Sequence, residues 1–157
     1  MRSLLWISAP CLVLAACVTM GPPLSPEDQE LQAVIEVPGQ SKDQLFARIL
    51  AWMAESFVSS KAVIELQDKE NGRIIGHGRT SFSSMGLVEI PCDYTLIVDV
   101  KDEKVRLTFN NFIGQWGKYR NEPYPVAEAG HARQIMQNLS SLPASLEAYL
   151  KKPETKW

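Results

Sequence analysis

The sequence predicts an α+β fold, a two-layer sandwich in which two helices cover one face of a curved antiparallel sheet of about five strands. Several short segments alternate apolar and polar residues, which is typical of strands with one buried and one solvated face. Two longer segments instead repeat apolar residues at helical spacing. The expected order is strand, helix, four strands and helix, with the second face of the sheet left open.

The single domain is expected to span residues 31–152, and its first strand to run from Leu31 to Val37, where a Pro-Gly pair stops it. Ser41 and Gln44 then predict a capping box, because each side chain can bond to the backbone N–H of the other residue. The helix that starts here is expected to end near Ser59. Its apolar stripe contains Leu45, Ile49, Trp52, Met53 and Phe57.

The remaining strands are predicted at 62–67, 73–82, 91–101 and 105–109. Asn71-Gly72 is a strong hairpin signal between the first two of them. Gly76 and Gly78 share one face of their strand, so we expect the helix with Trp52 to pack over them. The alternation fails at Asn110-Asn111, which indicates a β-bulge.

The carboxyl-terminal part is predicted to begin with a loop, residues 114–125, that carries Trp116 and Tyr119. A helical period follows from Val126. Pro143 interrupts it and removes one helical hydrogen bond, so this helix is expected to be kinked or split in two. The last residues, 153–157, form a polar tail.

These elements carry a family resemblance. Its residues are Val34 to Pro38, the Ser41-capped helix with Trp52, the stretch Gly72-Arg-Ile-Ile-Gly-His-Gly78, the strand with Tyr94, and the closing helix. Together they resemble a bacterial family of domains of unknown function described as having a TBP-like fold. The resemblance implies that shape and no known activity. Shape does not confer DNA binding, and no basic stripe lines the sheet, so we expect no nucleic-acid partner.

Residues 1–16 have the layout of a secretory signal, with Arg2 before an apolar run from Leu4 to Ala16. Leu14-Ala-Ala-Cys17 resembles the lipobox of bacterial lipoproteins. That resemblance implies cleavage after Ala16, diacylglycerol on the Cys17 sulfur and a further acyl chain, such as palmitate, on its new amino group.

Three other interpretations of this segment compete. A plain secretory signal would not need the cysteine, and a membrane-spanning helix needs about 20 apolar residues. A buried core helix would be unusual before Gly21-Pro22-Pro23 at an extreme amino terminus. We therefore favour a membrane anchor at Cys17, followed by a flexible tether, so that residues 17–30 lie outside the domain.

The residue that follows Cys17 indicates in which membrane the protein is expected. Val18 stands where an aspartate favours retention in the inner membrane of Gram-negative cells. The resemblance to lipoproteins therefore implies a place in the cell envelope on the outer membrane, facing the periplasm. Two or more acyl chains would hold the protein there stably.

Composition excludes several kinds of chemistry. The formal net charge is -2, with acids and bases interspersed. Once Cys11 leaves with the signal and Cys17 carries lipid, only Cys92 remains, so the mature chain forms no internal disulfide. Cys92 is expected to be buried, the alternative being a free thiol that pairs with another chain. His77 and His131 show no ligand-like spacing, so we expect no metal and no cofactor.

The open sheet face is the candidate binding surface. Its polar lining is expected to include His77, Arg79, Asp93, Thr95, Asp99, Arg106 and Thr108. The loop aromatic residues Trp116, Tyr119 and Tyr124 are a second candidate, the alternative being that they fold back over the sheet edge. One hypothesis is a non-enzymatic module that binds an envelope protein or itself. The alternative is an envelope enzyme or small-ligand binder built around His77, Arg79 and Asp93. A solvated face with cross-strand Arg–Asp pairs would show the same pattern without either function.

Overall fold

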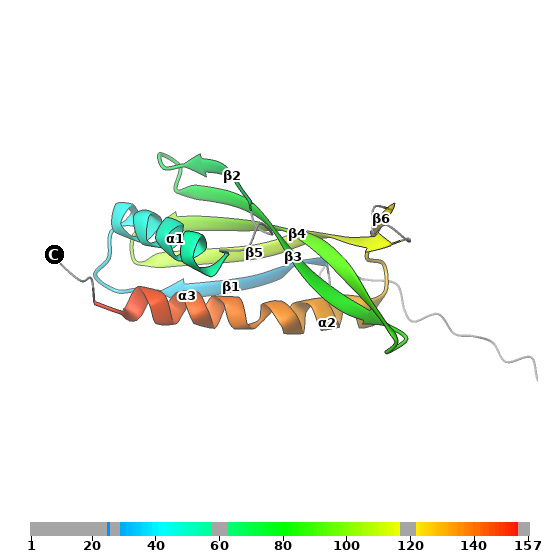
Figure 1. Ribbon diagram of the computed structural model, residues 1–157. Helices are drawn as coiled ribbons and strands as arrows, with labels where there is room; N and C mark the ends of the chain where they lie inside the picture. Colours follow the sequence, from blue (N-terminus) through cyan, green and yellow to red (C-terminus); the bar gives the residue numbers. More distant parts are fainter. Residues whose placement is uncertain (1–24, 26–28, 58–62, 117–121, 154–157) are drawn as a thin grey trace, which may run out of the picture.

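The computed structural model describes residues 25, 29–57, 63–116 and 122–153, and shows three helices packed on one side of a strongly twisted sheet (Figure 1). The predicted signal segment, Cys17 and Tyr119 lie outside these residues. The elements in chain order are β1 (Leu31–Glu36), α1 (Lys42–Ser56), β2 (Val63–Asp68), β3 (Arg73–Ser84), β4 (Val88–Lys101), β5 (Lys104–Trp116), β6 (Glu122–Pro125), α2 (Ala129–Leu139) and α3 (Ser141–Lys151).

The sheet is antiparallel and has the strand order β1-β5-β4-β3-β2. The short β6 pairs with the far part of β5, so the sheet has six strands. The predicted α+β class, with the helices on one face and the other face open, is confirmed.

The predicted capping box is present at the start of α1. The Ser41 hydroxyl accepts a hydrogen bond from the Gln44 backbone N–H at 3.4 Å, and the Gln44 Oε1 accepts one from the Ser41 N–H at 3.0 Å. The predicted bulge is confirmed as well. Between the pairs Asp93–Ile113 and Thr95–Asn110, β5 contains one residue more than β4, and Asn111 has φ 53°.

The predicted loop at 114–125 is wrong at both of its ends. β5 continues to Trp116, and β6 returns beside it with Gly114 opposite Tyr124. Glycine and proline conceal the alternation in these residues, and pairing between the two strands stabilises them. The closing helix is split at Ser140. Pro143 lies in the first turn of α3, where a backbone N–H has no helical partner in any case.

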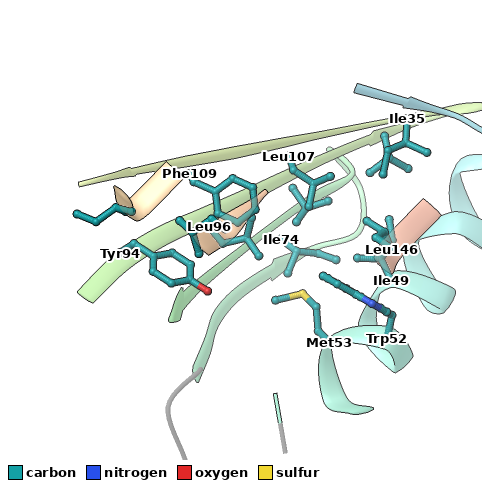
Figure 2. Close-up of a cluster of buried hydrophobic side chains, with 14 of the residues drawn as sticks. Ile35, Ile49, Trp52, Met53, Ile74, Tyr94, Leu96, Leu107, Phe109 and Leu146 are labelled. Carbon is teal, nitrogen blue, oxygen red and sulfur yellow. The ribbon is translucent and has the colours of Figure 1, made fainter. Parts of the chain in front are cut away.

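The core lies between the sheet and the helices as one continuous cluster (Figure 2). The expectation that Trp52 covers Gly78 is wrong. A Cβ at Gly78 would lie 2.3 Å from Cζ of Tyr94, so the Tyr94 ring from β4 covers this glycine. Trp52 instead lies beside Ile74 and Leu146 (Figure 2). The glycine pattern indicated a close approach, but only the neighbouring strand decides which side chain makes it.

Two amide side chains of α2 cover the edge of β3 beyond its pairing with β2. Gln134 accepts a hydrogen bond from the Ser83 N–H at 2.9 Å and donates one to the Ser83 carbonyl at 3.3 Å. Asn138 donates to the Ser81 carbonyl at 2.8 Å. α2 thus satisfies backbone groups that an open strand edge would expose. In the part of the chain that the structure describes, no helix is long and apolar enough to cross a membrane.

We expect Gly72→Ala to lower the free energy of unfolding by about 2 to 3 kcal/mol, because the turn needs both a left-handed backbone and close contact with β4. Gly72 has φ 67°, and a Cβ there would lie 2.3 Å from the Val100 carbonyl oxygen. Gly39→Ala is the matched control, since Gly39 has φ 81° and no atom within 4 Å of a Cβ. It should cost only about 1 kcal/mol in urea unfolding. Equal losses for both variants would contradict the proposed clash.

Candidate functional site

The open face consists of rows of side chains that run across the strands. One row is largely apolar: Leu66, Ile75, Ile97 and Thr108 lie opposite one another on β2, β3, β4 and β5. Leu66 has 44% of its surface exposed, whereas Thr108 is buried. The adjacent row on one side is charged, with Arg73, Asp99 and Arg106, and the adjacent row on the other side is polar, with His77 and Thr95. The face therefore presents an apolar strip between two sets of polar groups.

Asp99 is the centre of the first polar cluster. Its Oδ1 accepts a hydrogen bond from Arg73 Nε at 2.7 Å, and its Oδ2 accepts one from Arg106 Nη2 at 2.6 Å. Partial burial by itself would raise the pKa of Asp99. The two arginine hydrogen bonds outweigh it and hold the pKa of this carboxyl below its usual value. Asp99 therefore stays ionised and links side chains from three neighbouring strands, β3, β4 and β5.

Arg79 and Asp93 form the second cluster on β3 and β4. The guanidinium donates from Nε to Oδ1 at 2.5 Å and from Nη2 to Oδ2 at 3.1 Å, a two-point contact between a planar cation and a carboxylate. Gln115 of β5 donates a third hydrogen bond to Asp93 at 2.9 Å. The hydrogen bond to Asp93 raises the pKa of Arg79 above its ordinary value. The charges of Arg79 and Asp93 are therefore paired with each other within the open face.

His77 belongs to a third, more exposed cluster. Its Nε2 lies 2.6 Å from Glu65 Oε2, and its Nδ1 lies 3.4 Å from the Thr95 hydroxyl. Asn111, the bulge residue, donates to the same hydroxyl at 3.4 Å. About half of the His77 side chain, 47%, is exposed. The bulge in β5 thus brings a further amide to this cluster.

The structure brings all seven predicted polar residues of the open face onto one face: His77, Arg79, Asp93, Thr95, Asp99, Arg106 and Thr108. It does not place Trp116 among them. Sequence analysis missed Glu65, since β2 is irregular between Ile64 and Leu66, and Gln115, since its strand was taken for a loop. Gly114 conceals the alternation beside Gln115, so the sequence carried no clear signal for this residue.

Trp116 lies at the end of β5 on the helix side of the sheet. Its ring meets Tyr124 edge to face, with 6.5 Å between ring centroids, and Tyr124 meets Phe82 in the same way at 6.5 Å. The Tyr124 ring covers Gly114. Trp116, Tyr124, Glu128, His131 and Ser84 line an open groove of about 490 Å³. The aromatic residues therefore fold back over the sheet, while 46% of the Trp116 surface stays exposed.

Cys92 is fully buried on the helix side, as expected from its residue type. Burial raises the pKa of its thiol to about 12, and the nearby Asp93 charge acts in the same direction. His77 lies on the opposite face of the sheet, so the two side chains do not form a pair. Among the described residues, no group of three or more His, Cys, Asp or Glu side chains is placed to hold a metal ion.

Comparison with known proteins gives a family and a fold. A family model described as "Domain of unknown function (DUF4468) with TBP-like fold" matches residues 32–114. A crystal structure of a DUF4468 family protein from Bacteroides ovatus is similar with a TM-score of 0.66 and 17% identity, covering 88% of this chain and 95% of that one.

A TBP-like protein from Parabacteroides distasonis is similar with a TM-score of 0.64 and 12% identity, covering 80% of this chain and 94% of that one. At these identities the two likenesses establish the fold alone. No curated protein is significantly similar to the chain.

Proposed function

The chain belongs to the DUF4468 family of domains of unknown function with a TBP-like fold, and from this premise we propose that it is a lipid-anchored interaction module of the cell envelope without enzymatic activity. The observation that carries the proposal is the composition of the open face. Its charged groups bond to one another, and the strip between them, Leu66, Ile75 and Ile97, is apolar.

The anchor is supported by sequence alone. Cys17 follows a signal-like segment and completes a lipobox-like stretch, and Val18 favours the outer membrane with the domain in the periplasm. Lipid on Cys17 would make the membrane the first partner of this protein, since two or more acyl chains hold a protein stably. The tether of residues 17–30 would leave the domain free to meet a second partner.

The open face has the features of a protein-binding surface. Interfaces between proteins combine an apolar centre with a polar rim and are rich in arginine. Here the Arg106–Asp99 pair adjoins the apolar strip on one side, and the Arg79–Asp93 pair lies on the other side, beyond the row of His77 and Thr95. Because these charges are already bonded, a partner would bury them without leaving any of them unpaired. The partner is an envelope protein or a second copy of this chain.

The alternative, an envelope enzyme or small-ligand binder at His77, Arg79 and Asp93, has less support. Asp93 accepts hydrogen bonds from Arg79 and Gln115, and His77 bonds to Glu65. These side chains bond to one another and do not converge on a common point where a small molecule could bind. The same pairing disfavours nucleic acid, because phosphate binding requires cations that are free to neutralise it.

Site-directed photocrosslinking in the native envelope tests this proposal. With a photoreactive residue in place of Ile97, we expect a specific crosslinked product, whereas the same residue in place of Ala51, which is exposed on α1, should give none. Acyl labelling should be present in both proteins and absent from Cys17→Ser.

A charge-swapped variant, Arg79→Asp with Asp93→Arg, provides the matched control for the face. It keeps the cross-strand pair and the net charge but reverses their order, so the fold should persist while the crosslink weakens. If Ile97 gave no crosslink in envelope and no self-crosslink, the face would be merely solvated. Acyl labelling that persists in Cys17→Ser would refute the anchor.

A further inference from the structure

The two ends of the sheet differ in polarity. The β2–β3 and β4–β5 turns lie together at one end, and the β3–β4 hairpin projects from the other (Figure 1). The first two turns carry Lys69, Glu70, Asn71, Asp102 and Glu103, all exposed. The β3–β4 turn, residues 84–88, is Ser-Met-Gly-Leu-Val, and here Met85 is 91%, Leu87 87% and Val88 51% exposed.

The geometry of this turn does not account for its apolar residues. The Leu87 N–H donates to the Ser84 carbonyl at 3.1 Å, which closes a β-turn whose two central residues are Met85 and Gly86. Met85 and Gly86 both have positive φ, 52° and 69°. Such turns favour asparagine, aspartate or glycine at both central positions. Methionine is thus present where the backbone favours a small polar residue, and its side chain projects into solvent.

β1 begins on the side of the sheet from which the β3–β4 hairpin projects. β1 runs antiparallel to β5, with Leu31 opposite Phe109 and Glu36 opposite Lys104. Lys104 adjoins the polar β4–β5 turn, so β1 ends beside that turn and its first residue, Leu31, faces the side of the β3–β4 hairpin. Some thirteen residues separate Cys17 from Leu31, and they reach at most about 45 Å. The anchor and the apolar turn are therefore expected at the same end of the domain.

We propose that the β3–β4 turn inserts Met85 and Leu87 into the lipid bilayer that holds Cys17, an inference that rests on the anchor in the proposed function. A few apolar side chains bind a bilayer weakly alone, but the anchor raises their local concentration at its surface. Trp116, which lines one groove with Ser84 near the turn, is suited to the headgroup layer. Docking by the turn sets the polar end of the sheet away from the membrane.

The charged residue nearest the turn is an acid, which does not favour contact with anionic lipid. Glu89, which follows the turn, accepts a hydrogen bond from the Ser81 hydroxyl at 2.6 Å. The five residues of the turn carry no charge, so binding does not call for anionic lipid.

The test uses the mature protein reconstituted with phosphatidylcholine vesicles. A polarity-sensitive fluorophore is attached at Val88→Cys, the last residue of the turn, which leaves Met85 and Leu87 in place, or at Glu70→Cys, in the polar turn at the opposite end. The native Cys92 is buried and should not compete for the label. We expect the Val88→Cys emission to shift to the blue and to be quenched by brominated acyl chains, and the Glu70→Cys emission to remain as in water.

Met85→Asn with Leu87→Thr, made in the Val88→Cys background, should abolish the shift. Asparagine suits the turn, so urea unfolding should show no loss of stability, which separates membrane contact from folding. Acyl chain mass is measured on every sample, so that the two proposals fail separately.

An acylated protein whose Val88→Cys label stays in water would overturn this inference and leave the anchor standing. A protein without acyl chains whose label still enters vesicles would do the reverse. Equal shifts at both labels, or a shift without vesicles that grows with protein concentration, would also overturn it, the latter in favour of a second copy covering the turn.

Discussion

Trp52→Ala is expected to lower the free energy of unfolding by about 3 to 5 kcal/mol, the range for removing a fully buried large aromatic side chain. Trp52 is 1% exposed and links α1 to both α3 and the sheet. Its ring meets Phe57 edge to face at 5.6 Å, its Nε1 donates to the Ser145 hydroxyl of α3 at 3.3 Å, and it lies beside Ile74 of the sheet (Figure 2). Urea unfolding followed by circular dichroism measures the loss.

Two matched variants assign the effect. Trp116→Ala removes the same side chain from a site that is 46% exposed, and should cost less than about 1 kcal/mol. Trp52→Phe keeps most of the apolar contact but leaves the Ser145 hydroxyl without its donor, and should cost an intermediate amount. A loss for Trp52→Ala no larger than that for Trp116→Ala would contradict the place of Trp52 at the centre of the core.

The second large effect is alkaline destabilisation through Cys92. The unfolded thiol has a pKa near 9.0, and burial raises the pKa of the folded thiol to about 12. Between these values the unfolded chain has released a proton that the folded protein still holds. The contribution is therefore complete below about pH 9 and is lost as pH rises toward about 12. The loss should approach roughly 2 kcal/mol near pH 10.5 and about 4 kcal/mol in full.

Cys92→Ala isolates this contribution, because lysines and other common groups titrate in both proteins. The free energy of unfolding of the wild type should fall more steeply above pH 9 than that of the variant. Burial also raises the pKa of Tyr94 to about 12, so the variant keeps a smaller slope above pH 10. Parallel profiles for the two proteins would show that the thiol is not protected by the core.

The open face shows how much of a surface can be predicted from the pattern of residues in the sequence. Period-two alternation indicated which residues of β3, β4 and β5 point away from the helices, and predicted cross-strand Arg–Asp pairs as one interpretation. The structure contains such pairs at Arg79–Asp93 and Arg106–Asp99. Two further contacts could not be predicted without the register of the strands: Arg73 with Asp99, and Glu65 with His77. Each of these bonds joins residues distant in sequence.

The sequence by itself determined what local chemistry controls: the α+β class, the strands and their two faces, the capping box at Ser41 and the bulge at Asn111. Those features depend on hydrogen bonds and side-chain periods within a few residues. Only the tertiary structure decided that Tyr94 covers Gly78, that β6 pairs with β5 and that α2 covers the edge of β3. In each case the contact joins residues of different elements, and which elements meet depends on how the whole sheet twists and pairs.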